Sequence, residues 1–308
     1  MPYKIEKKLV VAIASSALFD LSDGDRIFRE KGEDLYRHYQ REHQKDILLP
    51  GVAFPFIKRL LNLNLAFPDL DPVEVVLLSK NDPDTGLRVF NSIKAHSLAI
   101  TRGGFLNGRP PFKYMPAFNA SLFLSANPDD VRNAILAGHA AGTVLRTNAV
   151  DDQSDQELRV AFDFDGVIVD DEAETVYKTH DLAQFQQTES DKVAIPHRPG
   201  PLSDLFRKLA VFQTLEHMKE RKDSRYKRVL RTAIITARNA PAHERVVTTL
   251  RAWGVTADET FFLGGIEKKR VLEILKPHIF FDDQMDHLKS AAETIPSVHI
   301  PFGISNKG

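Results

Sequence analysis

Carboxylates gather behind an apolar run in the middle of the chain. The stretch RVAFDFDGVIVDDE begins at Arg159, and its apolar segment leads into Asp163 and Asp165, with Gly166 directly behind them. Side chains at i and i+2 of a strand point the same way, so both carboxylates would face one site. Open α/β sheets bind ligands beyond the carboxyl ends of their strands, where these acids would lie. Gly166 would permit a sharp turn there. The alternative is a pair of acids in a surface loop.

Two later segments end in groups that could hold a phosphate. AIITARN carries Thr236, Ala237 and Arg238. A hydroxyl and free backbone N–H groups at the entry to a helix can bind phosphate oxygens, although a threonine there is also a common N-cap. GGIEKKR carries Lys268 and Lys269 after a Gly-Gly turn, where an ammonium can act as a point charge for phosphate. Solvent-facing side chains are the alternative for the arginine and for both lysines.

A fourth segment, HIFFDDQMDH, runs from large apolar residues into Asp282 and Asp283. Adjacent acids at the end of a buried strand are unfavourable when they are desolvated without a partner. A hard divalent cation relieves that repulsion, and Mg²⁺ needs few carboxylates because it keeps waters or substrate phosphate as its other ligands. The segment therefore predicts a Mg²⁺ site.

The elements that would position these residues occur twice in the chain. VEVVLLSKND matches LRTAIITARN, and the same spacing separates FLNG from FLGG and SLFLSAN from HIFFDDQ. At this spacing Ser79 corresponds to Thr236, and Arg88 to Arg245. PGVAFPFIKRL resembles PGPLSDLFRKL at a slightly shorter spacing. So long a period indicates two duplicated domains rather than a solenoid of short repeats.

The segment that joins the two copies is polar and acidic. RTNAVDDQSDQE, residues 146–157, has almost no large apolar residue, which is typical of a linker. We therefore predict domains at 1–147 and 148–308. Each copy reads as a strand, a variable insert, and then helices alternating with strands, a pattern that favours an α/β fold with a mainly parallel sheet. The insert of the second copy spans residues 171–228.

The composition excludes several classes of protein. The chain of 308 residues is 43% hydrophobic and 27% charged, and its net charge of −1 gives no support to a nucleic-acid or membrane-surface partner. It contains no cysteine, which excludes disulfides, thiolate zinc sites and a cysteine nucleophile. No apolar run approaches the roughly 18 residues that span a bilayer. The N-terminal apolar run lacks a clear signal-peptide cleavage site, so we expect a first core strand and a cytoplasmic protein.

The four segments together resemble the motifs of haloacid dehalogenase (HAD) superfamily phosphatases, in the order of that superfamily. VAFDFDGVIVDDEAE, ITARN, LRAWGV, FLGG and KPHIFFDDQMDH, with IASSALFD and PGVAFPFIKRL from the first half, are similar to the cytosolic 5′-nucleotidase type I family. The resemblance covers roughly residues 8–302. It implies two tandem HAD-like halves, the second with a cap formed by the insert.

The resemblance also implies a mechanism. Asp163 would attack phosphorus and form an aspartyl-phosphate, and Asp165 would protonate the leaving oxygen and later activate water. Mg²⁺ would be held by Asp163, by the backbone carbonyl of Asp165 and by Asp283. Asp282, which precedes Asp283 in HIFFDDQMDH, and Arg238 of AIITARN would support the site.

Thr236 and Lys268 would hold the phosphoryl oxygens, together with backbone groups at Gly166 and Ala237. The family register favours Lys268, and Lys269 stays open as its alternative. In the cap, His180 and His197 are candidates for substrate contact.

The first half lacks this chemistry. Ile13 and Ser15 stand where the second half has its two aspartates, and Ser125 begins the pair that corresponds to Asp282-Asp283. Ser79 keeps the hydroxyl, and Lys113 stands near the place of the motif-three lysine. We expect a degenerate HAD-like domain that serves substrate or effector binding, or structure alone.

The resemblance implies a Mg²⁺-dependent phosphomonoester hydrolase, a 5′-nucleotidase that acts on nucleoside 5′-monophosphates. Phe164 departs from the small residue usual between the two aspartates, so base preference cannot be transferred. The alternatives are a HAD phosphatase for another small phosphomonoester such as a sugar phosphate, and a nucleotide-binding regulator without turnover. A homo-oligomer stays open.

Overall fold

The computed structural model describes residues 3–180 and 182–306. The chain divides between Val144 and Leu145 into two units, close to the predicted boundary after residue 147. Residues 1–2 and 307–308 of the predicted domains, and residue 181 of the predicted insert, lie outside the described residues. The two units are described separately below.

The first unit is an open parallel sheet with helical connections. Its strand order is β3-β2-β1-β4-β5, and the paired strands run parallel. Its elements are η1 (Ile5–Lys7), β1 (Leu9–Ile13), α1 (Ser15–Leu18), α2 (Ser22–Lys31), α3 (Glu33–Glu42), α4 (Phe54–Ala66), β2 (Val73–Ser79), α5 (Pro83–Ala95), β3 (Arg102–Phe105), η2 (Pro111–Tyr114), η3 (Pro116–Phe118), β4 (Ala120–Ser125), α6 (Pro128–Leu136) and β5 (Ala141–Val144).

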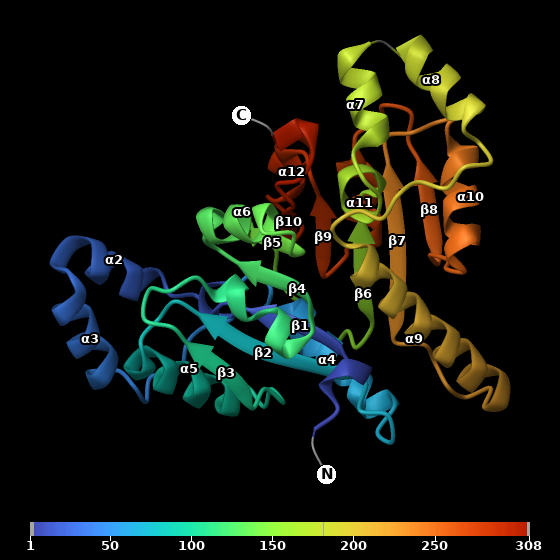
Figure 1. Cartoon of the computed structure of the whole chain (residues 1–308). Helices are drawn as coiled ribbons and strands as arrows, with labels where there is room; N and C mark the ends of the chain where they lie inside the picture. Colours follow the sequence, from blue (N-terminus) through green and yellow to red (C-terminus); the bar gives the residue numbers. More distant parts are fainter. Residues whose placement is uncertain (1–2, 181, 307–308) are drawn as a thin grey trace. The chain divides into compact units, whose positions relative to one another are not determined.

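The second unit repeats this strand order as β8-β7-β6-β9-β10, again with parallel pairs (Figure 1). Its elements are β6 (Leu158–Phe162), η4 (Phe164–Ile168), α7 (Glu172–Thr179), α8 (Leu182–Asp191), α9 (Ser203–Lys222), β7 (Leu230–Thr236), α10 (His243–Trp253), β8 (Glu259–Phe262), α11 (Lys268–Leu275), β9 (Ile279–Asp282), α12 (Met285–Ala291), β10 (Ser297–His299) and η5 (Ile304–Asn306).

The predicted α/β fold with a mainly parallel sheet is confirmed. The apolar run LVVAI forms β1 and is buried throughout, as expected of a strand covered on both faces. Each unit also has a fifth strand that the sequence pattern did not predict, β5 in the first unit and β10 in the second. Both are short, with four and three residues, so they carry little periodic signal.

Aromatic packing fixes the central strands of the second unit. The Phe162 ring at the end of β6 stacks on Phe281 of β9, with the centroids 5.3 Å apart. It also meets Phe206 of α9 edge-on at 5.5 Å. These three side chains are fully buried. They pack together on the two strands whose ends carry the predicted acids, and they attach α9 to the sheet.

The segment after β6 leaves the sheet and returns to it. An antiparallel bridge between Val169 and Pro199 closes this excursion, which contains α7 and α8. Figure 1 shows α7 and α8 together at one end of the second unit, while α9 extends toward the other end. The first unit has a similar excursion, closed by a bridge between Phe19 and Pro50 and containing α2 and α3.

Candidate active site

Three of the predicted site residues lie at the carboxyl ends of neighbouring strands. Asp163 directly follows β6, Thr236 is the last residue of β7, and Asp282 is the last residue of β9. Because β6 pairs in parallel with both β7 and β9, these three ends share one edge of the sheet. All three side chains are buried. The fold therefore brings together residues that are far apart in the sequence.

The turn after β6 needs glycine for two reasons. Gly166 has φ = +70°, in the left-handed region that other residues avoid. A Cβ at this position would also lie 2.6 Å from Oδ2 of Asp283. Asp163 Oδ1 accepts a hydrogen bond of 2.7 Å from the N–H of Phe164 within the same turn. The glycine thus lets Asp283 approach the backbone that follows Asp163.

Lys268 and Lys269 occupy different environments. Lys268 is the first residue of α11, and its buried Nζ lies 2.8 Å from Asp163 Oδ1 and 2.7 Å from Asp282 Oδ2. Lys269 instead pairs with Glu293 at 3.0 Å, with its side chain 25% exposed. Of the two, Lys268 is therefore the lysine that contacts the acidic cluster.

The clustered acids have strongly perturbed proton affinities. Burial raises the pKa of Asp163 to about 7, although the Lys268 ammonium opposes this rise. Burial, together with the charges of Asp163 and Asp282, raises the pKa of Asp283 to about 9. Burial also acts on Asp282, but Lys268 and His287 outweigh it and lower that pKa. Two of the three acids therefore hold protons readily, and cation binding would displace those protons.

The two motif-four acids differ in their partners. Asp282 Oδ1 accepts 2.8 Å from the N–H of Gln284, and Asp282 Oδ2 lies 3.2 Å from Nδ1 of His287. Oδ1 of Asp283 is buried and has no hydrogen-bond partner among the described residues. Asp163, Asp282 and His287 have ligand atoms close enough to form a metal-binding cluster, but Lys268 already bonds to both acids. Asp283 therefore has the larger unused capacity for a cation.

Asp165 points its carboxylate at Arg238. Arg238 Nε donates to Oδ2 and Nη2 donates to Oδ1, each at 2.7 Å, which is a bidentate pair. The Arg238 side chain is buried, and its backbone N–H reaches Oγ1 of Thr236 at 3.3 Å. Ala237, between these two residues, is exposed. Arg238 therefore contacts the second aspartate directly through a buried guanidinium.

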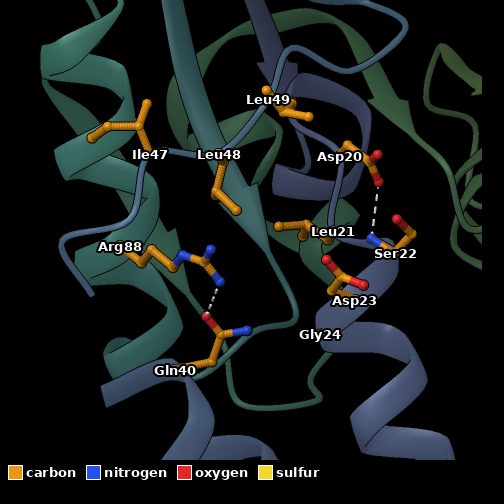
Figure 2. Close-up of a pocket in the computed structure, with 10 residues that line it drawn as sticks. All are labelled: Asp20, Leu21, Ser22, Asp23, Gly24, Gln40, Ile47, Leu48, Leu49 and Arg88. Atoms are coloured by element: carbon orange, nitrogen blue, oxygen red, sulfur yellow. Dashed lines mark hydrogen bonds between the residues drawn. The ribbon is translucent and has the colours of Figure 1, made fainter. Parts of the chain in front are cut away.

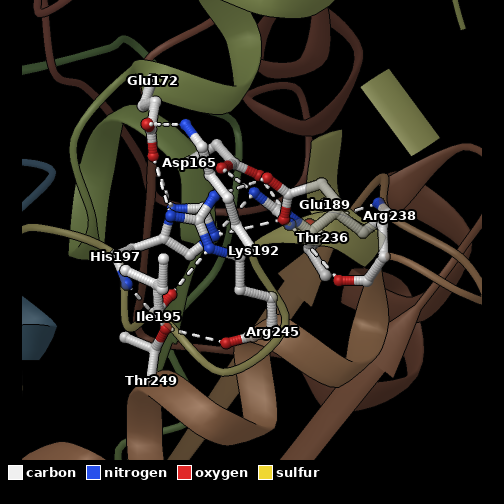
Figure 3. Close-up of polar contacts among 11 residues, drawn as sticks. Asp165, Glu172, Glu189, Lys192, Ile195, His197, Thr236, Arg238, Arg245 and Thr249 are labelled. Atoms are coloured by element: carbon white, nitrogen blue, oxygen red, sulfur yellow. Dashed lines mark hydrogen bonds and ion pairs between the residues drawn. The ribbon is translucent and has the colours of Figure 1, made fainter. Parts of the chain in front are cut away.

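Sequence reasoning missed most of the polar cluster that surrounds Arg238 (Figure 3). Glu189 of α8 pairs with Arg238 and also with Arg245 of α10, the latter at 2.8 Å. Both Glu189 and His197 are 2% exposed, and His197 Nε2 lies 3.3 Å from Glu189 Oε2. Burial opposes the charge of Glu189, but His197 and Arg238 outweigh it and lower the pKa of Glu189 to about 2. His180, the other candidate of the insert, is exposed.

The first unit has no acids at the equivalent positions. Ala14 N donates to Leu124 O at 2.8 Å, as Asp163 N does to Phe281 O at 2.8 Å. Ala14, rather than Ile13, is therefore the counterpart of Asp163. The turn between the strand and the bridge that closes the excursion is one residue shorter in this unit.

The other counterparts differ in outcome. Ser125 Oγ accepts from Asn127 N as Asp282 Oδ1 does from Gln284 N, so that predicted correspondence holds. Lys113 is exposed and is not equivalent to the buried Lys268.

Similarity to known proteins covers almost the whole chain. The family model described as 5′-nucleotidase matches residues 1–307. Human cytosolic 5′-nucleotidase 1B is 36% identical over 296 residues, which are 94% of this chain and 48% of that protein. The chain thus spans about half the length of the curated relative it matches.

Among solved structures, histidinol dehydrogenase from Elizabethkingia anophelis covers 94% of this chain and 52% of its own at 8% identity. Its TM-score of 0.23 carries no argument about the fold. Within the described residues, no helix is both long and apolar enough to cross a membrane. The family model, the human relative and the resemblance of the motifs agree: this chain belongs to the 5′-nucleotidase family.

Proposed function

We propose that the chain is a Mg²⁺-dependent 5′-nucleotidase that hydrolyses nucleoside 5′-monophosphates to nucleoside and phosphate. One observation carries the proposal: buried Lys268 lies within 2.8 Å of Asp163 at the end of the central strand, in a chain of the 5′-nucleotidase family. A carboxylate beside an ammonium suits attack on a phosphate, because the cation offsets the charge of the approaching phosphoryl group.

Asp163 is the proposed nucleophile. One of its carboxylate oxygens bonds to phosphorus while the bond from phosphorus to the nucleoside 5′-oxygen breaks, which gives an aspartyl-phosphate. Lys268 and Thr236 hold phosphoryl oxygens in this step, assisted by backbone N–H groups near Gly166 and Ala237. Thr236 is buried at the end of β7, beside the strand that leads into Asp163. Positioning and charge stabilisation supply most of the catalysis in phosphoryl transfer.

Asp165 is the proposed general acid and base. In its protonated form it donates a proton to the departing 5′-oxygen, because an alkoxide is a poor leaving group, and it is left as the carboxylate. In the second step it accepts a proton from the water that attacks the aspartyl-phosphate, which returns Asp163 and releases phosphate. Two carboxylates can divide the work in this way when their surroundings differ. Asp163 faces Lys268, whereas Asp165 faces Arg238.

The residues present fit a Mg²⁺ ion. Oδ1 of Asp283 is buried without a hydrogen-bond partner among the described residues, and the raised pKa of its carboxyl indicates an uncompensated site for negative charge. Asp163, the backbone carbonyl of Asp165 and the Asp283 side chain would hold the ion, with Asp282 in support. When bound, Mg²⁺ supplies charge neutralisation for the acids and the phosphate.

The proposal also assigns the fold of the chain to the HAD superfamily. The chain comprises two tandem HAD-like domains at 1–147 and 148–308, the first degenerate and the second catalytic. We propose that the cap is formed mainly by α7 and α8, at the start of the predicted range 171–228, because α9 packs on the sheet through Phe206. A cap of this kind excludes water from a phosphorylated substrate. By its family, the protein is proposed to act in the cytoplasm.

A screen of phosphate release tests the proposal. The purified chain is supplied with nucleoside 5′-monophosphates and sugar phosphates, with Mg²⁺ and with EDTA. We expect Mg²⁺-dependent release from the nucleotides and little release from the sugar phosphates. Faster release from sugar phosphates would favour the alternative of a phosphatase for another small phosphomonoester. Nucleotide binding without release under either condition would contradict the proposal and indicate a regulator.

A further inference from the structure

Arg238 is a buried cation whose hydrogen-bond partners come from the turn after β6, from α8 and from two loops. Two of its nitrogens bind Asp165 at 2.7 Å each, as described above. Nη1 binds Glu189 and also reaches the carbonyl of Ala242 at 3.3 Å, while Nη2 lies 3.1 Å from Nε2 of His197. Arg238 is 4% exposed, so its charge depends on these partners for compensation.

The first unit contains a counterpart of Arg245, the other arginine that binds Glu189. This counterpart is Arg88. Arg88 Nε donates to the carbonyl of Asp46 at 3.0 Å, as Arg245 Nε does to the carbonyl of Ile195 at 2.9 Å. Arg88 also reaches the side chain of Gln40 at 3.4 Å, where Arg245 reaches Glu189 at 2.8 Å. Figure 2 shows Arg88 and Gln40 at the pocket of the first unit. Both units therefore contain this arginine, as Arg88 in the first unit and as Arg245 in the second.

The backbone of the two units also identifies the counterpart of Arg238. Gly264 N donates to Arg238 O at 3.2 Å, and Asn107 N donates to Asn81 O at 3.2 Å. In addition, Arg238 N reaches Thr236 Oγ1 at 3.3 Å, just as Asn81 N reaches Ser79 Oγ at 3.3 Å. Asn81 thus occupies the position of Arg238.

The side chains at these counterpart positions are neutral. Asn81 Nδ2 donates to Ser15 Oγ at 2.8 Å, where Arg238 binds Asp165 in the second unit. Gln40 stands in the place of Glu189. The same local framework thus forms in the first unit with an amide pair and a hydroxyl. The first unit lacks an acid at the position of Asp165, and it also lacks the arginine at the position of Arg238 and the glutamate at the position of Glu189.

We propose that Arg238 is a positioning residue for Asp165, and that Glu189 of α8 supplies the second negative charge that holds the buried guanidinium in place. The inference rests on the proposed function, in which Asp165 passes a proton to the leaving oxygen. The planar fork binds both oxygens of the ionised carboxylate, the form that Asp165 takes once its proton has passed to the leaving oxygen, and so fixes the plane of that carboxylate, which a single ammonium cannot do. Through Glu189, the segment that contains α7 and α8 contributes to the geometry of the proton donor.

The test separates proton donation from every other function of the site. Single-turnover release of nucleoside is measured, with enzyme in excess, for a nucleoside 5′-monophosphate and for its analogue with a bridging 5′-sulfur. The thiolate leaves without a proton, whereas the alkoxide needs one, and the two substrates otherwise present the same groups. The variants are Arg238→Asn and Glu189→Gln, which copy the first unit, and Arg238→Lys. Arg245→Gln is the matched control, because it also removes a partner of Glu189 but does not touch Asp165.

We expect Arg238→Asn to slow release from the oxygen substrate by about 10²-fold, the range of general acid catalysis, and from the sulfur substrate by less than about 3-fold. Arg238→Lys should slow release from the oxygen substrate nearly as much as Arg238→Asn does. Glu189→Gln should also slow release from the oxygen substrate, but by a smaller factor. Arg245→Gln should leave the ratio between the two substrates as in the wild type. The double variant Arg238→Asn/Glu189→Gln removes one buried positive and one buried negative charge together, and measurement of its thermal unfolding beside its rates checks that the effect survives in a folded protein.

Equal slowing of both substrates by Arg238→Asn, or no slowing of either, would overturn the positioning role. A rise in KM for both substrates with an unchanged rate at saturation would do the same, because it would assign Arg238 to phosphate binding. Failure of the proposed function gives a different result, since the wild type would then release nucleoside from neither substrate.

Discussion

Lys268 donates to Asp163 across 2.8 Å, and both residues are buried. The pair joins the first residue of α11 to the residue that follows β6. Its chemical consequence is that the proposed nucleophile faces a permanent positive charge, since Asp163 and Asp282 outweigh burial and raise the pKa of the lysine.

Replacing each of the two adjacent lysines by alanine distinguishes their functions. Lys268→Ala removes the charge beside Asp163, and we expect kcat for a nucleoside monophosphate to fall by about 10²- to 10³-fold, as for loss of a transition-state stabilising donor. Lys269→Ala removes only a pair with Glu293 on a partly exposed side chain, so kcat should stay within about twofold. Steady-state kinetics of both variants decides this, and a larger loss in Lys269→Ala would reverse the assignment.

The position of Lys268 illustrates what the sequence could predict. The order of the motifs and the parallel sheet predicted which strand ends meet, because carboxyl ends of parallel strands lie at one edge. The choice between Lys268 and Lys269 was left open, since which lysine faces the sheet depends on where α11 begins. Glu189 carried no signal at all, because an acid in a polar helix is ordinarily exposed and only the tertiary fold buries it. The predicted counterpart Ile13 was wrong by one residue, because the length of the turn after the strand differs between the units.

The stability of the metal-free protein should depend on Asp283. Its pKa is raised from the unfolded value of 3.8 to about 9, so the folded state binds more protons than the unfolded state between these pH values. Stability from this group is therefore full below about pH 4 and is lost as pH rises toward 9. We expect thermal unfolding in EDTA to show this decline in the wild type and a flatter profile in Asp283→Asn.

The same variant tests the Mg²⁺ site. At pH 8, Mg²⁺ should raise the melting temperature of the wild type, because binding stabilises only the folded state, and should have little effect on Asp283→Asn. Without Mg²⁺, Asp283→Asn should be the more stable protein at that pH by about 1–3 kcal/mol, the scale for a buried group without a partner. Identical pH profiles and identical Mg²⁺ responses would contradict the assignment of Asp283.

Gly166 and Gly254 form a matched pair for the turn after β6. Their φ values are +70° and +67°, so the backbone strain of alanine at either position should reduce stability by about 1 kcal/mol, and the contact with Asp283 adds to the loss at position 166. A Cβ meets Asp283 only at position 166, and nothing lies within 4 Å of it at position 254. We expect Gly166→Ala to lose most hydrolysis as well, and Gly254→Ala to keep it. Chemical denaturation and phosphate release measure the two effects. Full activity in Gly166→Ala would show that the close approach of Asp283 is not needed.

The most direct test of the central claim is to trap phosphate on the chain during turnover. A nucleoside monophosphate is mixed with the enzyme and Mg²⁺, and the reaction is quenched with acid. The acyl phosphate is then reduced with tritiated borohydride, which releases the phosphate and converts the modified aspartate to tritium-labelled homoserine. We expect labelled homoserine at position 163 and no trapped label in Asp163→Asn. Label mapped to another residue, or turnover by Asp163→Asn near the wild-type rate, would contradict it.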